Sequence, residues 1–227
     1  PPTLTNGNVH GIIVLNVYNE RLLRLLAETQ IPKVFLDTSS LVAPDELNGD
    51  LLLMESRTSV RRITSHLLEQ GRTLPGFIGD IGYAQSNRER YEGFCQALTD
   101  AGKKVDSSLC LTTPLGIDTY REEIDTFLSS LSRVPDAFVC ASDYVACILM
   151  QLLEKRGLRV PEDVAVSGFD NNTEDLLAEH LTTVQVFNEE LGARLALQIL
   201  YRIKYPNTPH EVTYLGTNVL YRDSTGD

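Results

Sequence analysis

The stretch that decides the fold is residues 136–170, which read DAFVCASDYVACILMQLLEKRGLRVPEDVAVSGFD. A short apolar strand over 137–140 leads into a helical pattern over 143–155, and a second apolar strand follows over 164–166. Strands that are apolar on both faces and separated by an amphipathic helix are typical of a β-α-β unit. They predict a parallel sheet that is covered by helices on both faces.

The same alternation extends toward both ends of the chain. Further strands are expected at residues 11–17, 34–36, 51–54, 76–78, 109–111, 212–215 and 218–221. Helices are expected at residues 20–28, 59–70, 86–101, 119–131 and 189–203. No linker rich in proline, glycine or serine divides the chain, so any two lobes must share several crossings.

Length and charge limit the classes of function. A chain of 227 residues with 42% hydrophobic and 22% charged residues fits one large domain or two small ones. No apolar run reaches the roughly 18 residues that a membrane span needs. Lys and Arg number 20 against 31 Asp and Glu, a net charge of -11, which argues against this stretch gripping a phosphate backbone by itself.

Motifs for catalysis, cofactors and metals are missing from the sequence. No G-x-S-x-G elbow, P-loop, H-E-x-x-H or G-x-G-x-x-G pattern occurs, and the histidines show no metal-ligand spacing. The cysteines Cys95, Cys110, Cys140 and Cys147 form no C-x-x-C pair, which favours free thiols in a reducing cytoplasm. We therefore expect no enzyme, no cofactor, no metal and, without a secretion leader, a cytoplasmic protein.

Polar residues follow the predicted strands at the edge where an open parallel sheet binds its ligands. Carboxylates that accept from neighbouring hydroxyls, together with a guanidinium that donates to others, suit a ligand covered in hydroxyl groups. Arg90 in the next helix supplies the guanidinium, and Tyr18, Tyr83 and Phe187 could stack on the apolar face of a sugar. The strand-end residues are Asp37, Asp80, Ser142, Asp143 and Asp170.

Structural roles compete with this interpretation. Asp143 directly precedes a helix, so we expect it to be the N-cap of that helix. Asp37 and Asp170 precede the predicted loops 38–49 and 171–179, which leaves a ligand role and a turn role equally open. Arg90 could equally pair with Glu89 or Asp80 on a solvated surface.

Seven segments in register resemble the effector-binding core of bacterial transcription regulators of the lactose/galactose-repressor (LacI/GalR) family. Four of them follow residue 159: VPEDVAVSGFD at 160–170, LTTV at 181–184, LGxxLA at 191–196 and RDST at 222–225. Three lie upstream: HLxxxGR at 66–72, RxxGF at 90–94 and PDAFVCASD at 135–143.

The resemblance implies an α/β, two-lobed, periplasmic-binding-protein-like fold in which each lobe is a parallel sheet flanked by helices. Residues 1–54 and 187–215 would form an N-terminal lobe that is incomplete in this chain. Residues 55–186 and 216–227 would form the C-terminal lobe.

The resemblance also implies the binding residues. Asp37, Arg90 and Asp170 match typical effector contacts of the family, and Ser142 replaces the asparagine of its A-N-D motif. Asn16, at another strand end, and the aromatic residues Tyr83 and Phe187 complete the candidate site.

The implied function is that of a sensor. A small effector, expected to be a sugar, would close the lobes and alter the operator affinity of a homodimer, with DNA bound by a headpiece absent from this chain. The helix around 144–153, with Val145, Ile148 and Leu149, is either the dimer interface or a core helix. The alternatives are a solute receptor of a sugar transporter and a carbohydrate-processing enzyme.

Overall fold

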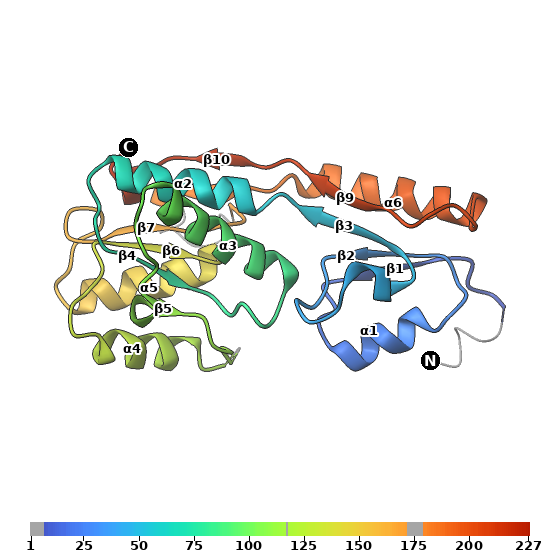
Figure 1. Cartoon of the computed structure of the whole chain (residues 1–227), viewed down its shortest axis with the longest axis horizontal. Coiled ribbons are helices and arrows are strands. Elements are labelled where there is room, and N and C mark those ends of the chain that lie inside the picture. The colour runs from blue at the N-terminus through green and yellow to red at the C-terminus, as the bar shows by residue number, and fades with distance from the viewer. Residues whose placement is uncertain (1–6, 117, 172–178) are drawn as a thin grey trace. The chain divides into compact units, whose positions relative to one another are not determined.

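Contacts between residues divide the chain into two compact units (Figure 1). The computed structural model describes residues 7–116, 118–171 and 179–227. Unit 1 contains the described part of Pro1–Glu55, the short segment Tyr83–Ser86, and Phe187–Gly216. Unit 2 contains Ser56–Gly82, Asn87–Val186 and Thr217–Asp227.

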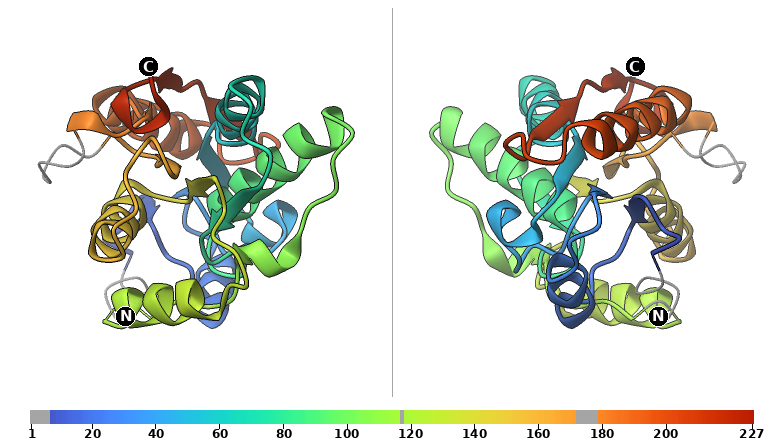
Figure 2. Two further views of the ribbon diagram at one scale, coloured as in Figure 1. Left: turned by 90° about the vertical axis from the view of Figure 1, so that its left-hand side faces the viewer. Right: turned by 90° about the vertical axis from the view of Figure 1, so that its right-hand side faces the viewer.

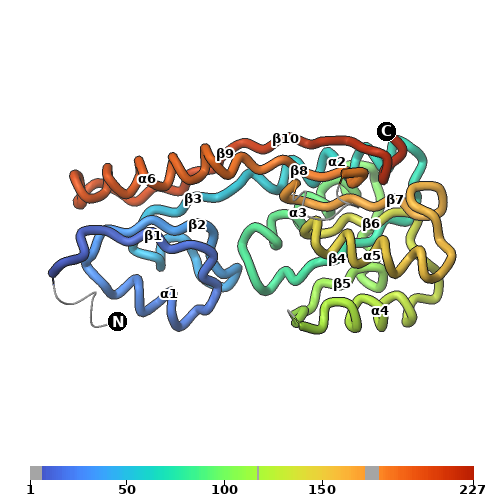
Figure 3. Tube along the Cα trace, turned by 180° about the vertical axis from the view of Figure 1, so that it is seen from behind, coloured from blue at the N-terminus to red at the C-terminus, as the bar shows by residue number. Residues whose placement is uncertain are grey.

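Unit 1 is a four-stranded parallel sheet in the order β1-β2-β3-β9, with helices on both faces. The side chains of β2 alternate between two separate apolar clusters, because successive residues of a strand point to opposite faces. Phe35 packs with Leu23 of α1, while Val34 packs with Leu195 of α6. Helices α1 and α6 lie on opposite sides of the strands of this unit (Figures 1 and 3). The elements are β1 (Ile12–Leu15), α1 (Glu20–Ala27), β2 (Lys33–Leu36), β3 (Asp50–Met54), α6 (Asn188–Lys204) and β9 (Val212–Leu215).

Unit 2 holds a second parallel sheet in the order β5-β4-β6-β7. Its strands are β4 (Pro75–Ile78), β5 (Cys110–Leu111), β6 (Ala137–Cys140) and β7 (Ala165–Ser167). Its helices are α2 (Arg57–Glu69), α3 (Gln85–Asp100), α4 (Tyr120–Ser130) and α5 (Asp143–Lys155), of which α3 starts within unit 1.

Helices cover both faces of the sheet of unit 2, as the end-on views show (Figure 2). Phe138 of β6 packs with Ile124 of α4 and the apolar side of α5. On the other face, the ring of Phe77 in β4 lies 5.7 Å from the ring of Phe94 in α3. The α/β class with parallel, helix-flanked sheets, as predicted from the sequence, is therefore confirmed.

Helix α5 is a core helix of unit 2. Val145, Ile148 and Leu149, which the sequence offered as a possible dimer interface, keep only 3%, 7% and 0% of their surface exposed. They pack within the apolar core of the unit itself. The structure therefore supports the core alternative for these three residues. Tyr144 of α5, in contrast, is 59% exposed and lies at the surface.

One strand pair differs from the sequence prediction. The predicted C-terminal strand is present as β10 (Asn218–Leu220), and it pairs antiparallel with β8 (Thr183–Gln185). The sequence did not predict β8, because a strand of three residues is too short to show a periodic pattern. Of the loop predicted at 171–179, residues 172–178 lie outside the described part of the chain.

Candidate ligand-binding site

Asp37 ends β2 and is the centre of a polar group in unit 1. Its side chain accepts the hydroxyl proton of Ser86 at 2.6 Å (Oγ to Oδ2) and the N–H groups of Thr38 at 2.8 Å and Ser86 at 3.3 Å (both to Oδ1). The residue is 2% exposed. With the Tyr18 hydroxyl, which also contacts Asp37, these groups make four donors that hold the carboxylate in one orientation.

Tyr18 brings three of the predicted residues together. Its hydroxyl lies 3.3 Å from Oδ2 of Asp37 and 3.3 Å from Oδ1 of Asn16. Its ring lies against the ring of Tyr83, with centroids 4.3 Å apart. Tyr83 is 47% exposed and Asn16 is also exposed, so the polar group of unit 1 presents an aromatic face and an amide to solvent.

Backbone conformation marks the same strand ends. Asn16, Asp37 and Asp170 have φ angles of 51°, 59° and 110°, a region that residues other than glycine rarely occupy. Such conformations cost free energy and cluster at ligand-binding sites. Three of the predicted site residues are therefore held in strained positions beyond strand ends: Asn16 and Asp37 directly follow β1 and β2, and Asp170 lies three residues after β7.

Arg90 of α3 is the centre of a second polar group, in unit 2. Its side chain is 5% exposed, and its guanidinium carbon lies 3.6 Å from the centroid of the Phe169 ring. Its Nη1 donates to the carbonyl oxygen of Ala141, but its Nε is buried and has no hydrogen-bond partner among the residues that the structure describes. The surface pairing with Glu89 or Asp80 considered from the sequence is therefore wrong.

Asp170 lies beside Arg90 without a full contact. Its Oδ1 is 3.6 Å from Nη2 of Arg90, too far for a hydrogen bond, and its side chain is 42% exposed. Desolvation by the surrounding protein raises the pKa of the Asp170 carboxyl. The attraction of the Arg90 charge lowers the pKa, but by less than desolvation raises it. A carboxyl and a guanidinium at this spacing leave room for a hydroxyl group that bonds to both.

Ser142, and not Asp143, caps helix α5. The Ser142 hydroxyl accepts the N–H of Val145 at 3.3 Å, which is the pattern of an N-cap. The expectation for Asp143 was one residue off: its carboxylate is 2% exposed and accepts the hydroxyl of Thr183 at 2.6 Å. Ser142 also follows Ala141, whose carbonyl holds Arg90, so it lies at the edge of the Arg90 group.

The structure does not place every candidate in these two groups. Phe187 precedes α6 in unit 1 and is 38% exposed, and no contact with the other candidates is seen among the described residues. Asp80 accepts the N–H of Gly82 at 2.8 Å and so forms a local turn.

The sequence missed three groups that hold the candidates. Ser86 binds Asp37, the ring of Phe169 supports Arg90, and the carbonyl of Ala141 accepts from Arg90. Phe169 lies inside the G-F-D motif, so its position next to Asp170 was a usable signal. A backbone carbonyl leaves no signal in the sequence.

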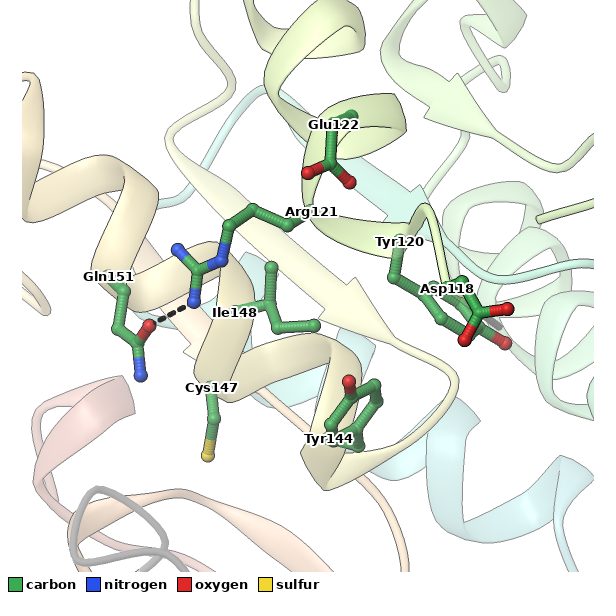
Figure 4. Close-up of a pocket in the computed structure, with 8 residues that line it drawn as sticks. All are labelled: Asp118, Tyr120, Arg121, Glu122, Tyr144, Cys147, Ile148 and Gln151. Atoms are coloured by element: carbon green, nitrogen blue, oxygen red, sulfur yellow. Dashed lines mark hydrogen bonds between the residues drawn. The ribbon is translucent and has the colours of Figure 1, made fainter. Parts of the chain in front are cut away.

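A separate cavity of about 350 Å³ lies between α4 and α5 (Figure 4). The rings of Tyr120 and Tyr144 meet edge to face there, 5.7 Å apart, and Arg121 donates to the side chain of Gln151. None of the seven candidates lines it, so we do not assign the predicted effector to it.

Titratable groups elsewhere in the described residues form no metal or thiolate centre. No group of three or more His, Cys, Asp or Glu side chains is placed to hold a metal ion within those residues. Burial raises the pKa of the Cys110 thiol to about 11 and that of Cys140 well above its ordinary value, so both thiols are protonated at neutral pH. Over the same residues, no helix is long and apolar enough to cross a membrane.

The chain thus consists of two α/β units, each with a parallel sheet and with polar groups beyond its strand ends. Residues 64–225 match the family described as a periplasmic binding protein-like domain, and the chain belongs to that family.

Known proteins with similar sequences are transcription regulators. The HTH-type transcriptional repressor PurR of Glaesserella parasuis is 27% identical over 206 residues, which cover 90% of this chain and 59% of the relative. The HTH-type transcriptional regulator DegA of Bacillus subtilis is 31% identical over 170 residues, which cover 74% of this chain and 48% of the relative. The chain thus spans about half to three fifths of the length of these relatives.

A solved structure described as a complex of the transcriptional regulator CelR with cellobiose is also similar. It is 28% identical, with a TM-score of 0.86, over 98% of this chain and 68% of that one. The resemblance to effector-binding domains of LacI/GalR-type regulators is confirmed by these matches. The relatives are regulators and not enzymes, which also confirms the non-enzymatic prediction.

Proposed function

We propose that this domain senses a small hydroxylated molecule, expected to be a sugar, on behalf of a transcription regulator. The observation that carries the proposal is the state of Arg90. Its guanidinium is buried against Phe169, its Nε has no partner within the described part of the chain, and its Nη2 lies 3.6 Å from Oδ1 of the half-exposed Asp170. A buried donor without a partner is rare in proteins, and a ligand that supplies the acceptor would account for this one.

The chemistry of both groups suits a polyol. A sugar hydroxyl can donate to Asp170 while its oxygen accepts from Arg90, which satisfies both ends of the incomplete pair. In unit 1, Asn16 offers an amide and the ring of Tyr83 offers a face for the apolar side of a sugar ring. The cellobiose in the CelR structure supports a sugar, and Ser142 of this chain stands where the family motif has an asparagine.

We further propose that both groups bind one effector, so that binding draws the two units into a closed state. An effector shifts such an equilibrium only by its differential affinity for the closed state. A coupling of about 1–3 kcal/mol changes the affinity for operator DNA by about 5–150-fold. DNA would be bound by a headpiece outside this chain, in keeping with the net charge of -11, and operator binding would place the protein in the cytoplasm.

A homodimer is part of this proposal. The α4–α5 surface supports it, because Tyr144 is 59% exposed next to Tyr120, and Arg121 and Glu122 line the same cavity with opposite charges. A two-fold interface brings the same patch of both subunits together, so Arg121 and Glu122 would be available to pair across it with the opposite charges of the second copy. Tyr144→Glu is expected to yield monomers in analytical ultracentrifugation; a dimer that persists in this variant would place the interface elsewhere.

The effector site is tested by calorimetry and thermal shift with a panel of sugars, sugar phosphates and nucleobases, cellobiose included. A ligand at 100 times its Kd stabilises the fold by about 2.7 kcal/mol, which a thermal shift detects. Arg90→Lys is expected to abolish this shift, because an ammonium cannot replace the stacked, multidentate guanidinium.

Arg72 provides the matched control for Arg90. Its guanidinium donates to the carbonyl oxygens of Asp136 at 3.2 Å and Pro161 at 2.6 Å, so it has a structural role in the same unit. Arg72→Lys is expected to lower the melting temperature and leave the ligand affinity unchanged. If Arg90→Lys bound the sugar as well as the parent protein, the site assignment would be wrong.

A further inference from the structure

Arg90 is held between two segments that follow neighbouring strands. Its Nη1 donates to the carbonyl oxygen of Ala141, directly after β6. Its guanidinium lies 3.6 Å from the ring of Phe169, two residues after β7. The spacing of these two segments therefore decides where the guanidinium lies.

Asp143 connects the same two segments. Its backbone N–H donates to the carbonyl oxygen of Phe169 at 2.8 Å. Its carboxylate, 2% exposed, accepts the hydroxyl of Thr183 in β8 at 2.6 Å. Asp143 lies two positions after Ala141. It therefore links the segment whose carbonyl oxygen accepts from Arg90 to the segment whose Phe169 ring lies against Arg90.

The packing at Gly168 shows how closely this carboxylate fits. A Cβ atom at Gly168 would lie 2.2 Å from Oδ1 of Asp143, well inside contact distance. The absence of a side chain at Gly168 thus makes room for the carboxylate against the segment that carries Phe169 and Asp170. The glycine of the G-F-D motif and the acid of the A-S-D motif fit each other.

We propose that Asp143 is a positioning residue of the effector site: its carboxylate, bonded to Thr183 and packed against Gly168, holds the Phe169 segment beside Ala141 and thereby orients Arg90. The expected effect of Asp143 on sugar binding rests on the proposed function. Its effect on the position of Arg90 does not, and can be measured without a ligand. A helix-capping role does not account for the contacts of Asp143, because Ser142 caps α5 and the Asp143 carboxylate bonds to a different strand.

Nuclear magnetic resonance of the Arg90 Nε–H group tests the geometric part without any ligand. A proton above an aromatic ring is shifted upfield, and a buried one exchanges slowly with water. The signal is assigned by its loss in Arg90→Lys. Asp143→Ala is expected to remove the upfield shift and to speed exchange, whereas Asp143→Asn, which keeps an oxygen for Thr183, is expected to retain both.

Asp136→Ala is the control for loss of stability alone. Asp136 accepts the N–H groups of Thr73 at 2.6 Å and Leu74 at 2.9 Å, at the opposite end of β6 from Ala141. This variant is expected to melt at a lower temperature and to keep the Arg90 signal. Should Asp143→Ala fail to fold, Thr183→Val removes the hydroxyl donor with little change of shape and is expected to weaken the upfield shift.

Binding of cellobiose or another sugar from the panel, by calorimetry, gives the second measurement. Asp143→Ala is expected to bind at least about tenfold more weakly than Asp143→Asn. If the alanine variant keeps both the Arg90 signal and the affinity, Asp143 is structural only and the inference is overturned. If no sugar binds the parent protein, the proposed function fails, while the Arg90 signal still decides the role of Asp143.

Discussion

At the scale of single residues, Ser142 combines two roles that can be separated. As the N-cap of α5 it satisfies a backbone N–H, and removal of such a cap costs about 1 kcal/mol. Ser142→Ala is therefore expected to lower the free energy of unfolding by about 1 kcal/mol in urea titrations. Ser142→Asn restores the family amide and caps equally well, so it is expected to keep stability and change sugar preference. Equal losses of stability in both variants would show that the cap is not the stabilising contact.

The ionised carboxylate of Asp170 is expected to favour ligand binding but to lower the stability of the folded protein. Its pKa is raised in the folded protein, so the stability it contributes is present below the ordinary carboxyl range, near pH 4, and is lost as pH rises through the folded pKa. At pH 7 the ionised carboxyl therefore disfavours folding. Asp170→Asn is expected to raise the melting temperature at pH 7, with a difference that shrinks toward pH 4.

The same substitution is expected to weaken sugar binding by about 1.5–3 kcal/mol, because a hydrogen bond to a charged group is lost. Melting curves from pH 4 to pH 8 and calorimetry at pH 7 provide the two measurements. A melting temperature that falls at pH 7 would mean that Arg90 stabilises the ionised form of Asp170 more than burial penalises it. Unchanged affinity would remove Asp170 from the site.

Strand-end residues were predictable from the sequence, whereas their partners were not. Asp37 and Asp170 stand out because a carboxylate follows an apolar run, and Arg90 stands out as the guanidinium of the R-x-x-G-F segment in the helix after a strand. Whether such a residue is buried depends on segments distant in the chain, such as Ser86 for Asp37 and Ala141 for Arg90. The one-residue error at Asp143 arose because serine and aspartate are equally good caps, and only the turn geometry distinguishes them.

At the scale of elements, the glycine of the R-x-x-G motif sets the contact between α3 and α2. A Cβ atom at Gly93 would lie 2.2 Å from the backbone carbonyl oxygen of Arg57, so the helices touch at this point. Gly93→Ala is expected to lower the free energy of unfolding by about 1–3 kcal/mol through overpacking, despite the better helix propensity of alanine.

Gly192 in α6 is the matched control, because nothing lies within 4 Å of a Cβ atom placed there. Gly192→Ala is expected to stabilise the protein by about 0.5–1 kcal/mol, since only the helix propensity changes. Chemical denaturation of both variants provides the comparison. If both alanines stabilised the chain, the close approach of α3 to α2 would be disproved.

A buried ion pair fixes the end of α6 to β3 in unit 1. Nη2 of Arg202 lies 2.5 Å from Oδ1 of Asp50, and both side chains are 2% exposed. Removal of one partner leaves the other charge buried, at a cost of about 3–5 kcal/mol. Arg202→Met is expected to show such a loss in urea titrations.

The exposed pair of Arg24 and Glu46 in the same unit is the comparison, with side chains 49% and 39% exposed. Arg24→Met is expected to change stability by less than about 1 kcal/mol, because exposed pairs contribute little. A similarly small effect of Arg202→Met would mean that Gln198 and the backbone N–H of Glu211, which also donate to Asp50, suffice to hold its charge.

At the scale of the whole molecule, the alternation of apolar strands and helices was enough to predict parallel-sheet structure covered by helices, whereas the division into two sheets was predicted from the family resemblance. The assignment of strands to sheets was not contained in that alternation. Strand β9 lies next to β3 although more than 150 residues separate Leu52 from its partner Thr213, and no local pattern reports such a pairing. The resemblance to a known family supplied the information that the periodicity lacked.

The decisive question for the whole molecule is whether one effector is bound by both units. Each unit contains its own reporter: the amide of Thr38, which donates to Asp37 in unit 1, and the amide of Asp170, which donates to Val184 in unit 2. Hydrogen exchange measures the free energy of opening at each amide separately. Because a shared ligand must leave both groups before either can open, saturating sugar is expected to slow exchange at both amides.

At 100 times the Kd, the free energy of opening at each amide is expected to rise by up to about 2.7 kcal/mol. In Arg90→Lys both gains are expected to vanish together, although the substitution lies in unit 2. Protection confined to Asp170 would show that unit 2 binds the effector alone, and closure of the two units would then have no driving force.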